Sequence, residues 1–121
     1  MVLVDTSVWV YHFQCGSRRL GELLGEMRVA VHPYIIGELA CGRLEKRREI
    51  LLLLHALPET SRVSQTELLY FIDRRFLAGT GIGFVDAHLL ASAELMKIPL
   101  WSFDKRLVRA ARKLRLSYTS D

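Results

Sequence analysis

A chain of 121 residues, half of them hydrophobic and a quarter charged, has the composition of one globular domain rather than of a disordered or fibrous protein. Its formal net charge of +4 is compatible with a polyanionic partner but does not by itself identify one. The longest apolar stretch, 50–57, is far shorter than the roughly 20 residues that cross a bilayer, and 1–4 is strand-like rather than a targeting segment. We therefore expect one cytoplasmic domain, 1–121, with no membrane partner.

The first half of the chain alternates short apolar segments, typical of buried strands, with segments whose apolar residues recur at helical spacing. The predicted strands are 2–4 and 29–31, and the predicted helices are 6–13, 18–27, 34–41 and 43–57. Pro33 and Pro58 end the second strand and the fourth helix, because proline lacks the backbone N–H that either element would use. Leu20, Leu23 and Leu24 should form the inner face of the second helix.

The second half continues this alternation. A short strand at 62–63 is followed by a helix with a capping box, in which Ser64 caps and Glu67 lies three residues later. The apolar stripe of that helix is predicted as Leu68, Leu69, Ile72 and Phe76. We next predict a flexible glycine-rich loop at 79–83 and a buried helix at 86–96. They are followed by a strand at 99–103, a helix at 105–114 and a last strand at 116–119.

Strands that alternate with helices predict an α/β fold, with a central, mostly parallel sheet of four or five strands flanked by helices. Leu107, Ala110, Ala111 and Leu114 share one face of the last predicted helix, which should pack on the sheet.

Four carboxylates occupy positions that suit a shared site. Asp5 and Asp104 directly follow predicted strands, and ligands bind beyond the carboxyl ends of parallel strands. Asp86 opens the buried helix, and Glu38 lies within the apolar segment YIIGELA, where an acid is costly unless it is neutralised. An all-oxygen cluster suits Mg²⁺ or Mn²⁺, which supports phosphodiester hydrolysis.

Each acid also has an ordinary structural explanation. Asp5 and Asp104 could cap helices, Asp86 could complement a helix dipole, and Glu38 could be a solvated helix residue. The combination of four acids in one topological neighbourhood favours the metal site.

Four sequence segments together resemble the PIN-domain family, most closely its VapC toxin branch. The resemblance extends over 2–107, and the matching segments are VLVDTSVW, IIGELA, GIGFVDAHLLASA and PLWSFDKRL. It implies a PIN-like fold and a Mg²⁺- or Mn²⁺-dependent endoribonuclease of a type II toxin–antitoxin system, which cleaves RNA and arrests translation. It also implies a homodimer and a cognate VapB-like antitoxin that blocks the site.

Carried over by position, the resemblance implies catalytic and metal-binding roles for Asp5, Glu38, Asp86 and Asp104, and supporting roles for Ser7 and Ser102. Some relatives carry a further acid one turn after the third motif's Asp. Here that region contains only His88, Leu89 and Leu90, which leaves open whether one ion or two are bound.

Other residues have two interpretations each. Lys105 and Arg106 adjoin Asp104 and could contact RNA phosphates, or could belong to a solvated helix face. His88 is expected to be structural, and Cys15 and Cys41 to be buried free thiols of a reducing compartment. The apolar run 50–57 suggests burial against a partner chain or the antitoxin.

Three functions therefore compete. An RNA-cleaving toxin is the leading one. A nuclease of housekeeping RNA maturation, or one acting on DNA, would use the same chemistry. A non-catalytic metal- or nucleic-acid-binding module, such as a receiver domain, would need a phosphoacceptor aspartate after a mid-chain strand, and the sequence has none there.

Overall fold

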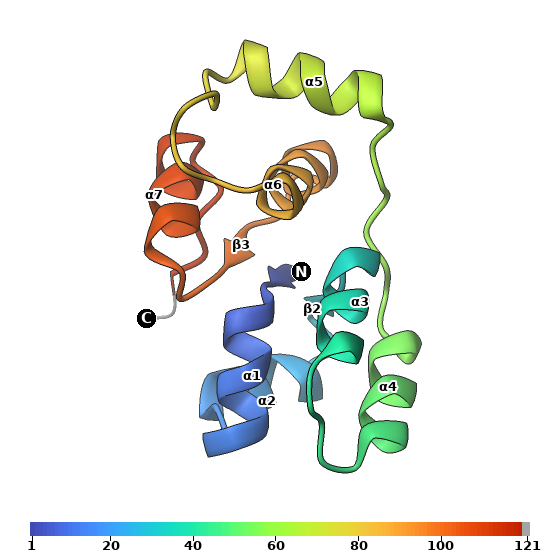
Figure 1. Cartoon of the computed structure of the whole chain (residues 1–121). Helices are drawn as coiled ribbons and strands as arrows, with labels where there is room; N and C mark the ends of the chain where they lie inside the picture. Colours follow the sequence, from blue (N-terminus) through green and yellow to red (C-terminus); the bar gives the residue numbers. More distant parts are fainter. Residues whose placement is uncertain (120–121) are drawn as a thin grey trace.

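The computed structural model describes residues 1–119, which form a three-stranded parallel sheet and seven helices (Figure 1). The strands are β1 (Val2–Val4), β2 (Val29–Ala30) and β3 (Leu100–Trp101), in the order β2-β1-β3. Leu3 of the central strand pairs with Ala30 on one side and Leu100 on the other. All strand residues are buried, which explains why these segments are continuously apolar rather than alternating.

The helices lie close to their predicted positions. They are α1 (Thr6–Cys15), α2 (Arg18–Gly25), α3 (Pro33–Cys41), α4 (Arg47–Ala56), α5 (Gln65–Arg74), α6 (Phe84–Met96) and α7 (Lys105–Lys113). The predicted capping box is present, because Ser64 Oγ accepts from the Glu67 backbone N–H while the Glu67 carboxylate accepts from the Ser64 N–H. The α/β class and the parallel sheet are confirmed.

The described residues contain three strands, fewer than the four or five predicted, because each edge of the sheet is extended by a single bridge only. Val31 pairs with Glu59 beyond β2, and Leu100 pairs with Ser117 beyond β3. The predicted last strand is thus reduced to one bridge. The predicted strand at 62–63 is wrong: the pairing occurs three residues earlier, next to Pro58, whose carbonyl accepts from the Val31 N–H.

Two helix predictions also need correction. The fourth helix begins at Arg47 rather than at residue 43, because Lys46 has a left-handed backbone with φ of 54°. On α5, Leu68 and Phe71 are the buried residues, whereas Leu69 is 52% exposed and Phe76 is 85% exposed. Phe76 lies beyond the end of α5 with φ of 57°, so helical spacing no longer places it on the inner face.

The buried helix is confirmed as α6, in which every residue from 87 to 93 is buried. It contacts both α5 and β3, and Figure 1 shows it lying between the long α5 helix and the sheet. In α7, the predicted inner residues Leu107, Ala110, Ala111 and Leu114 are all buried. Burial of a leucine side chain such as that of Leu107 contributes about 1.5–3 kcal/mol.

Some surface features differ from expectation. Cys15 and Cys41 are free thiols, as predicted, but both are exposed rather than buried. They end α1 and α3, where the helix turns toward solvent. In the apolar run of α4, Leu54 is buried and Leu52 is 65% exposed. None of the helices within residues 1–119 is long and apolar enough to span a membrane.

Candidate active site

Asp5 lies at the carboxyl end of the central strand, and its side chain is 6% exposed. Its Oδ2 accepts hydrogen bonds from Ser102 Oγ at 2.7 Å and Ser7 Oγ at 2.8 Å. The Asp5 backbone N–H donates to the Trp101 carbonyl at 2.9 Å, so the ends of β1 and β3 are joined here. The Asp5 side chain makes no capping bond to α1, which removes capping as the explanation of this acid.

The two serines connect Asp5 to the segment between β3 and α7. Ser7 Oγ accepts from the Phe103 backbone N–H, and Ser102 Oγ accepts from the Asp104 N–H, both at 3.0 Å. Each hydroxyl therefore donates a hydrogen bond to the buried carboxylate and accepts one from a backbone N–H of the segment that follows β3. Because two hydroxyls that are themselves fixed by backbone N–H groups donate to the same carboxylate oxygen, Asp5 is held in one orientation.

Asp86 lies in the first turn of α6 and is half-buried. Its pKa is raised from an ordinary 3.8 to about 6, first by burial and then by the negative charges of Asp5, Asp104 and Glu38, in that order. A hydrogen bond from the Gly83 backbone acts in the opposite direction. The other three acids that the sequence singled out therefore lie close enough to Asp86 to disfavour its ionised form.

Glu38 is exposed on α3, and its Oε1 accepts from Thr6 Oγ1 at 2.7 Å. This bond links α3 to the first residue of α1. The local sequence pattern assigns Thr6 no role at the site, so its contact with Glu38 was missed. The signal was its position next to Asp5, but a partner 32 residues away cannot be read from local spacing.

Asp104 is exposed and does cap a helix, as its alternative interpretation stated. Its Oδ1 accepts from the backbone N–H groups of Arg106 at 2.9 Å and Leu107 at 3.2 Å, at the start of α7. Capping uses one oxygen of this carboxylate. The other oxygen accepts no hydrogen bond from residues 1–119.

The donor set fits a hard divalent cation, since all four groups are carboxylates. Within residues 1–119, however, no three His, Cys, Asp or Glu side chains are gathered closely enough to bind one ion. Like charges without a counter-ion separate, and here Glu38 and Asp104 are hydrogen-bonded to Thr6 and to the α7 backbone. The other three acids thus lie near enough to Asp86 to raise its pKa, but not close enough to bind one ion in this arrangement.

Comparison with known proteins places this arrangement in a family. The family model of the PIN domain matches residues 2–113. This chain belongs to the PIN-domain family. It is 45% identical over 111 residues to proteins named ribonuclease VapC32 from two strains of Mycobacterium tuberculosis, with 91% of this chain and 90% of each relative covered.

The PIN fold is also found in a solved structure of low sequence similarity. PAE2754 from Pyrobaculum aerophilum superposes with a TM-score of 0.67 at 17% identity, over 95% of this chain and 93% of that one. At this identity the likeness extends to the fold alone.

In this PIN-domain chain, His88 is structural, as predicted. It is buried between Tyr34 and Phe84, with ring centroids 4.9 and 4.7 Å from its own, and burial lowers its pKa. Lys105 and Arg106 are exposed in the first turn of α7, directly after Asp104. Their contact with RNA stays a prediction.

Proposed function

We propose that this PIN-domain protein is a Mg²⁺- or Mn²⁺-dependent endoribonuclease that hydrolyses RNA phosphodiester bonds, with Asp5, Glu38, Asp86 and Asp104 as its metal-binding, catalytic carboxylates. The observation that carries the proposal is the raised pKa of Asp86, which the other three acids increase. Four acids that repel one another lower the stability of the protein, and a bound divalent cation relieves that repulsion. The name of the 45%-identical relatives, a ribonuclease, supports the substrate class.

The protein's own residues have distinct tasks in this proposal. Ser7 and Ser102 hold the Asp5 carboxylate in one orientation, because both donate to the same oxygen. Asp86 has to lose its proton before it can act as a ligand, since its pKa lies near 6. A divalent ion in this site would supply activation of the attacking water and charge stabilisation at the leaving oxygen.

The biological setting follows from the relatives. The name VapC supports a toxin of a type II toxin–antitoxin system that acts in the cytoplasm and inhibits translation. We expect a VapB-like antitoxin as partner and a homodimer as the assembled form. Leu52 and Leu53 are exposed apolar side chains on α4 that a partner would cover. Residues 1–121 would constitute one PIN domain.

Cleavage of labelled RNA by matched variants tests the site. We expect the wild-type protein to cleave in Mg²⁺ or Mn²⁺ but not in EDTA. Asp86→Asn and Glu38→Gln should each reduce the cleavage rate by more than about 100-fold. That is more than the loss of activity usually seen when a residue that only hydrogen-bonds to a metal ligand is replaced. Asp73→Asn, an exposed acid on α5, is the control and should cleave normally. Metal-dependent cleavage that persists in both Asp5→Asn and Asp86→Asn would refute this site.

A further inference from the structure

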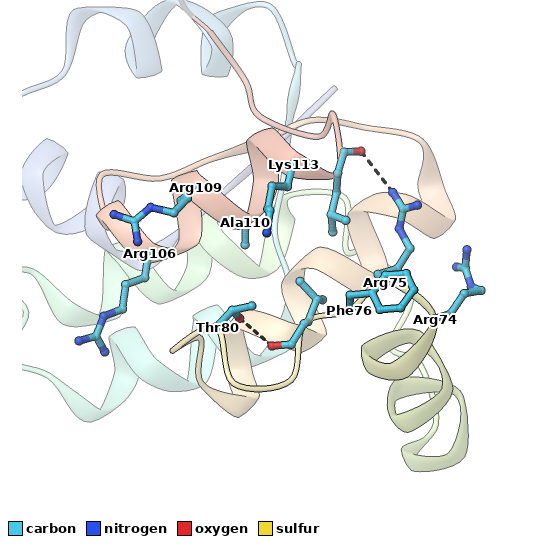
Figure 2. A pocket seen from close by; sticks show the side chains of 10 residues that line it. Arg74, Arg75, Phe76, Thr80, Arg106, Arg109, Ala110 and Lys113 are labelled. Atoms are coloured by element: carbon cyan, nitrogen blue, oxygen red, sulfur yellow. Dashed lines mark hydrogen bonds between the residues drawn. The ribbon is translucent and has the colours of Figure 1, made fainter.

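A cavity of about 510 Å³ lies beside α7, on the side of the segment that connects α5 to α6. Figure 2 shows the side chains that line it, contributed by α7 and by residues 74–80. Five of them are basic and one is aromatic, namely Arg74, Arg75, Arg106, Arg109, Lys113 and Phe76. No acidic residue lines this cavity, so its character is that of an anion site.

Two of the five cations share one carboxylate partner, Glu94. Arg74 Nη2 lies 2.6 Å from Glu94 Oε2, and Arg75 Nε lies 3.0 Å from Glu94 Oε1. Arg75 also donates to the Leu114 carbonyl, at 3.5 Å. These arginines connect the end of α5 to α6 and α7, and we assign them a structural role.

The other three cations have no such partner. Among residues 1–119, no carboxylate forms an ion pair with Arg106, Arg109 or Lys113. Their spacing of three and then four residues places them along one face of α7. At 1.5 Å per residue they extend over about 10 Å, the length of roughly three stacked nucleotides in one strand. Arg106 lies within the first turn of α7, and its backbone N–H is one of the two that Asp104 caps.

Phe76 completes the cavity from the opposite side. Its side chain is 85% exposed. Its backbone φ of 57° is the left-handed conformation that ends α5, as Met27, Lys97 and Arg115 do after other helices. An exposed aromatic ring beside unpaired cations is the combination by which proteins bind single-stranded nucleic acid: bases stack on the ring, and phosphates contact the cations.

We propose that this cavity binds a single-stranded segment of RNA next to the cleaved bond, with a base stacked on Phe76 and phosphates bound by Arg106, Arg109 and Lys113. The inference rests on the proposed ribonuclease function and adds a substrate subsite to it. The subsite begins at Arg106, two residues after Asp104 in the first turn of α7, so RNA bound there would lie next to the carboxylate site. Neither stacking on Phe76 nor phosphate binding forms hydrogen bonds with the base edges. Binding should therefore tolerate many RNA sequences.

Binding of a 5′-fluorescein-labelled 12-nucleotide single-stranded RNA tests the subsite, with fluorescence anisotropy measured between 50 and 300 mM salt. All variants carry Asp86→Asn to prevent cleavage. Arg109→Ala with Lys113→Ala should lower the slope of log affinity against log salt by about 1.4, because each phosphate contact contributes about 0.7. Arg43→Ala with Arg48→Ala removes the same charge from exposed positions outside the cavity, and should change the slope little.

Phe76 is tested by keeping its size while removing its π face. Phe76→Leu should weaken binding by about tenfold at every salt concentration, whereas Phe76→Trp should restore it. Leu69→Ala, which shortens an exposed side chain on α5, should bind like the parent. The subsite is refuted if the two double variants lose affinity equally, or if Phe76→Leu binds like the parent.

Further measurements distinguish the RNA subsite from a contact between chains and from the proposed ribonuclease function. A change of oligomeric state in Phe76→Leu, measured by analytical ultracentrifugation, would assign the ring to a contact between chains and overturn the stacking role. If the protein with Asp86 intact does not cleave RNA in Mg²⁺ or Mn²⁺ while the cavity variants still weaken binding, the proposed function fails and the subsite stands. If it cleaves and the cavity variants have an unchanged KM, the subsite fails and the function stands.

Discussion

Replacing Asp86 by asparagine should stabilise the metal-free protein at neutral pH, although it removes a proposed ligand. The carboxyl of Asp86 has a pKa of about 6 in the fold and an ordinary value of 3.8. Because the folded-state pKa is raised, the fold prefers the protonated form, and the ionised group destabilises it above pH 6. Asparagine carries no charge and has nearly the same shape, so the variant avoids this cost.

The size of the effect follows from the shift. Each pKa unit corresponds to about 1.4 kcal/mol, so a shift of about two units sets an upper bound near 3 kcal/mol. Asp86 is only half-buried, and solvent screening reduces this to about 1–2 kcal/mol. The gain should decrease between pH 6 and pH 4, and vanish below the unfolded-state pKa, where the wild-type carboxyl is protonated in both states.

Urea unfolding in EDTA at pH 7.5 and at a series of lower pH values measures this difference. Asp73→Asn is the matched control, an exposed acid that should change the unfolding free energy by less than about 0.5 kcal/mol. Adding Mg²⁺ should stabilise the wild type more than Asp86→Asn, because only the former retains all four acids. A variant that is neutral or destabilised at pH 7.5, or whose gain is unchanged at pH 4, would refute the argument that carboxylates crowd this site.

Three further predictions concern single side chains. Ser102→Ala removes a donor to the buried Asp5 carboxylate and should destabilise the fold by about 1.5–3 kcal/mol in urea unfolding; a loss below 0.5 kcal/mol would show that water replaces it. Ser64→Ala breaks the capping box of α5 and should cost about 1 kcal/mol in the same assay, and an unchanged midpoint would contradict that role. Burial, with the nearby charges of His88 and Arg62, lowers the pKa of His32 to about 4, so its imidazole should stay neutral at pH 5 in an NMR titration. Because the unfolded chain binds this proton and the folded chain does not, the stability of the fold should decrease as the pH drops from 6.5 toward 4. If the His32 ring of the folded protein is protonated near pH 6.5, His32 does not cause that loss of stability.

Local patterns predicted the elements well, because their causes are local. The capping box at Ser64 satisfies backbone N–H groups within one helical turn, and Pro33 opens α3 where a missing N–H costs nothing. The buried face of α7 followed from spacing alone. Where the chain leaves a helix the same reasoning failed: periodicity included Phe76 in the stripe of α5, although α5 ends at Arg74.

By itself, the sequence determined that Asp5 and Asp104 follow apolar strands, and parallel topology then brings such positions to one edge of the sheet. Only the tertiary structure decided what each acid contacts. Ser102 reaches Asp5 across 97 residues, and Thr6 reaches Glu38 across 32, because neighbouring strands and helices meet in space irrespective of their separation along the chain. The repulsion that raises the pKa of Asp86 likewise depends on distances between four elements, which no local pattern contains.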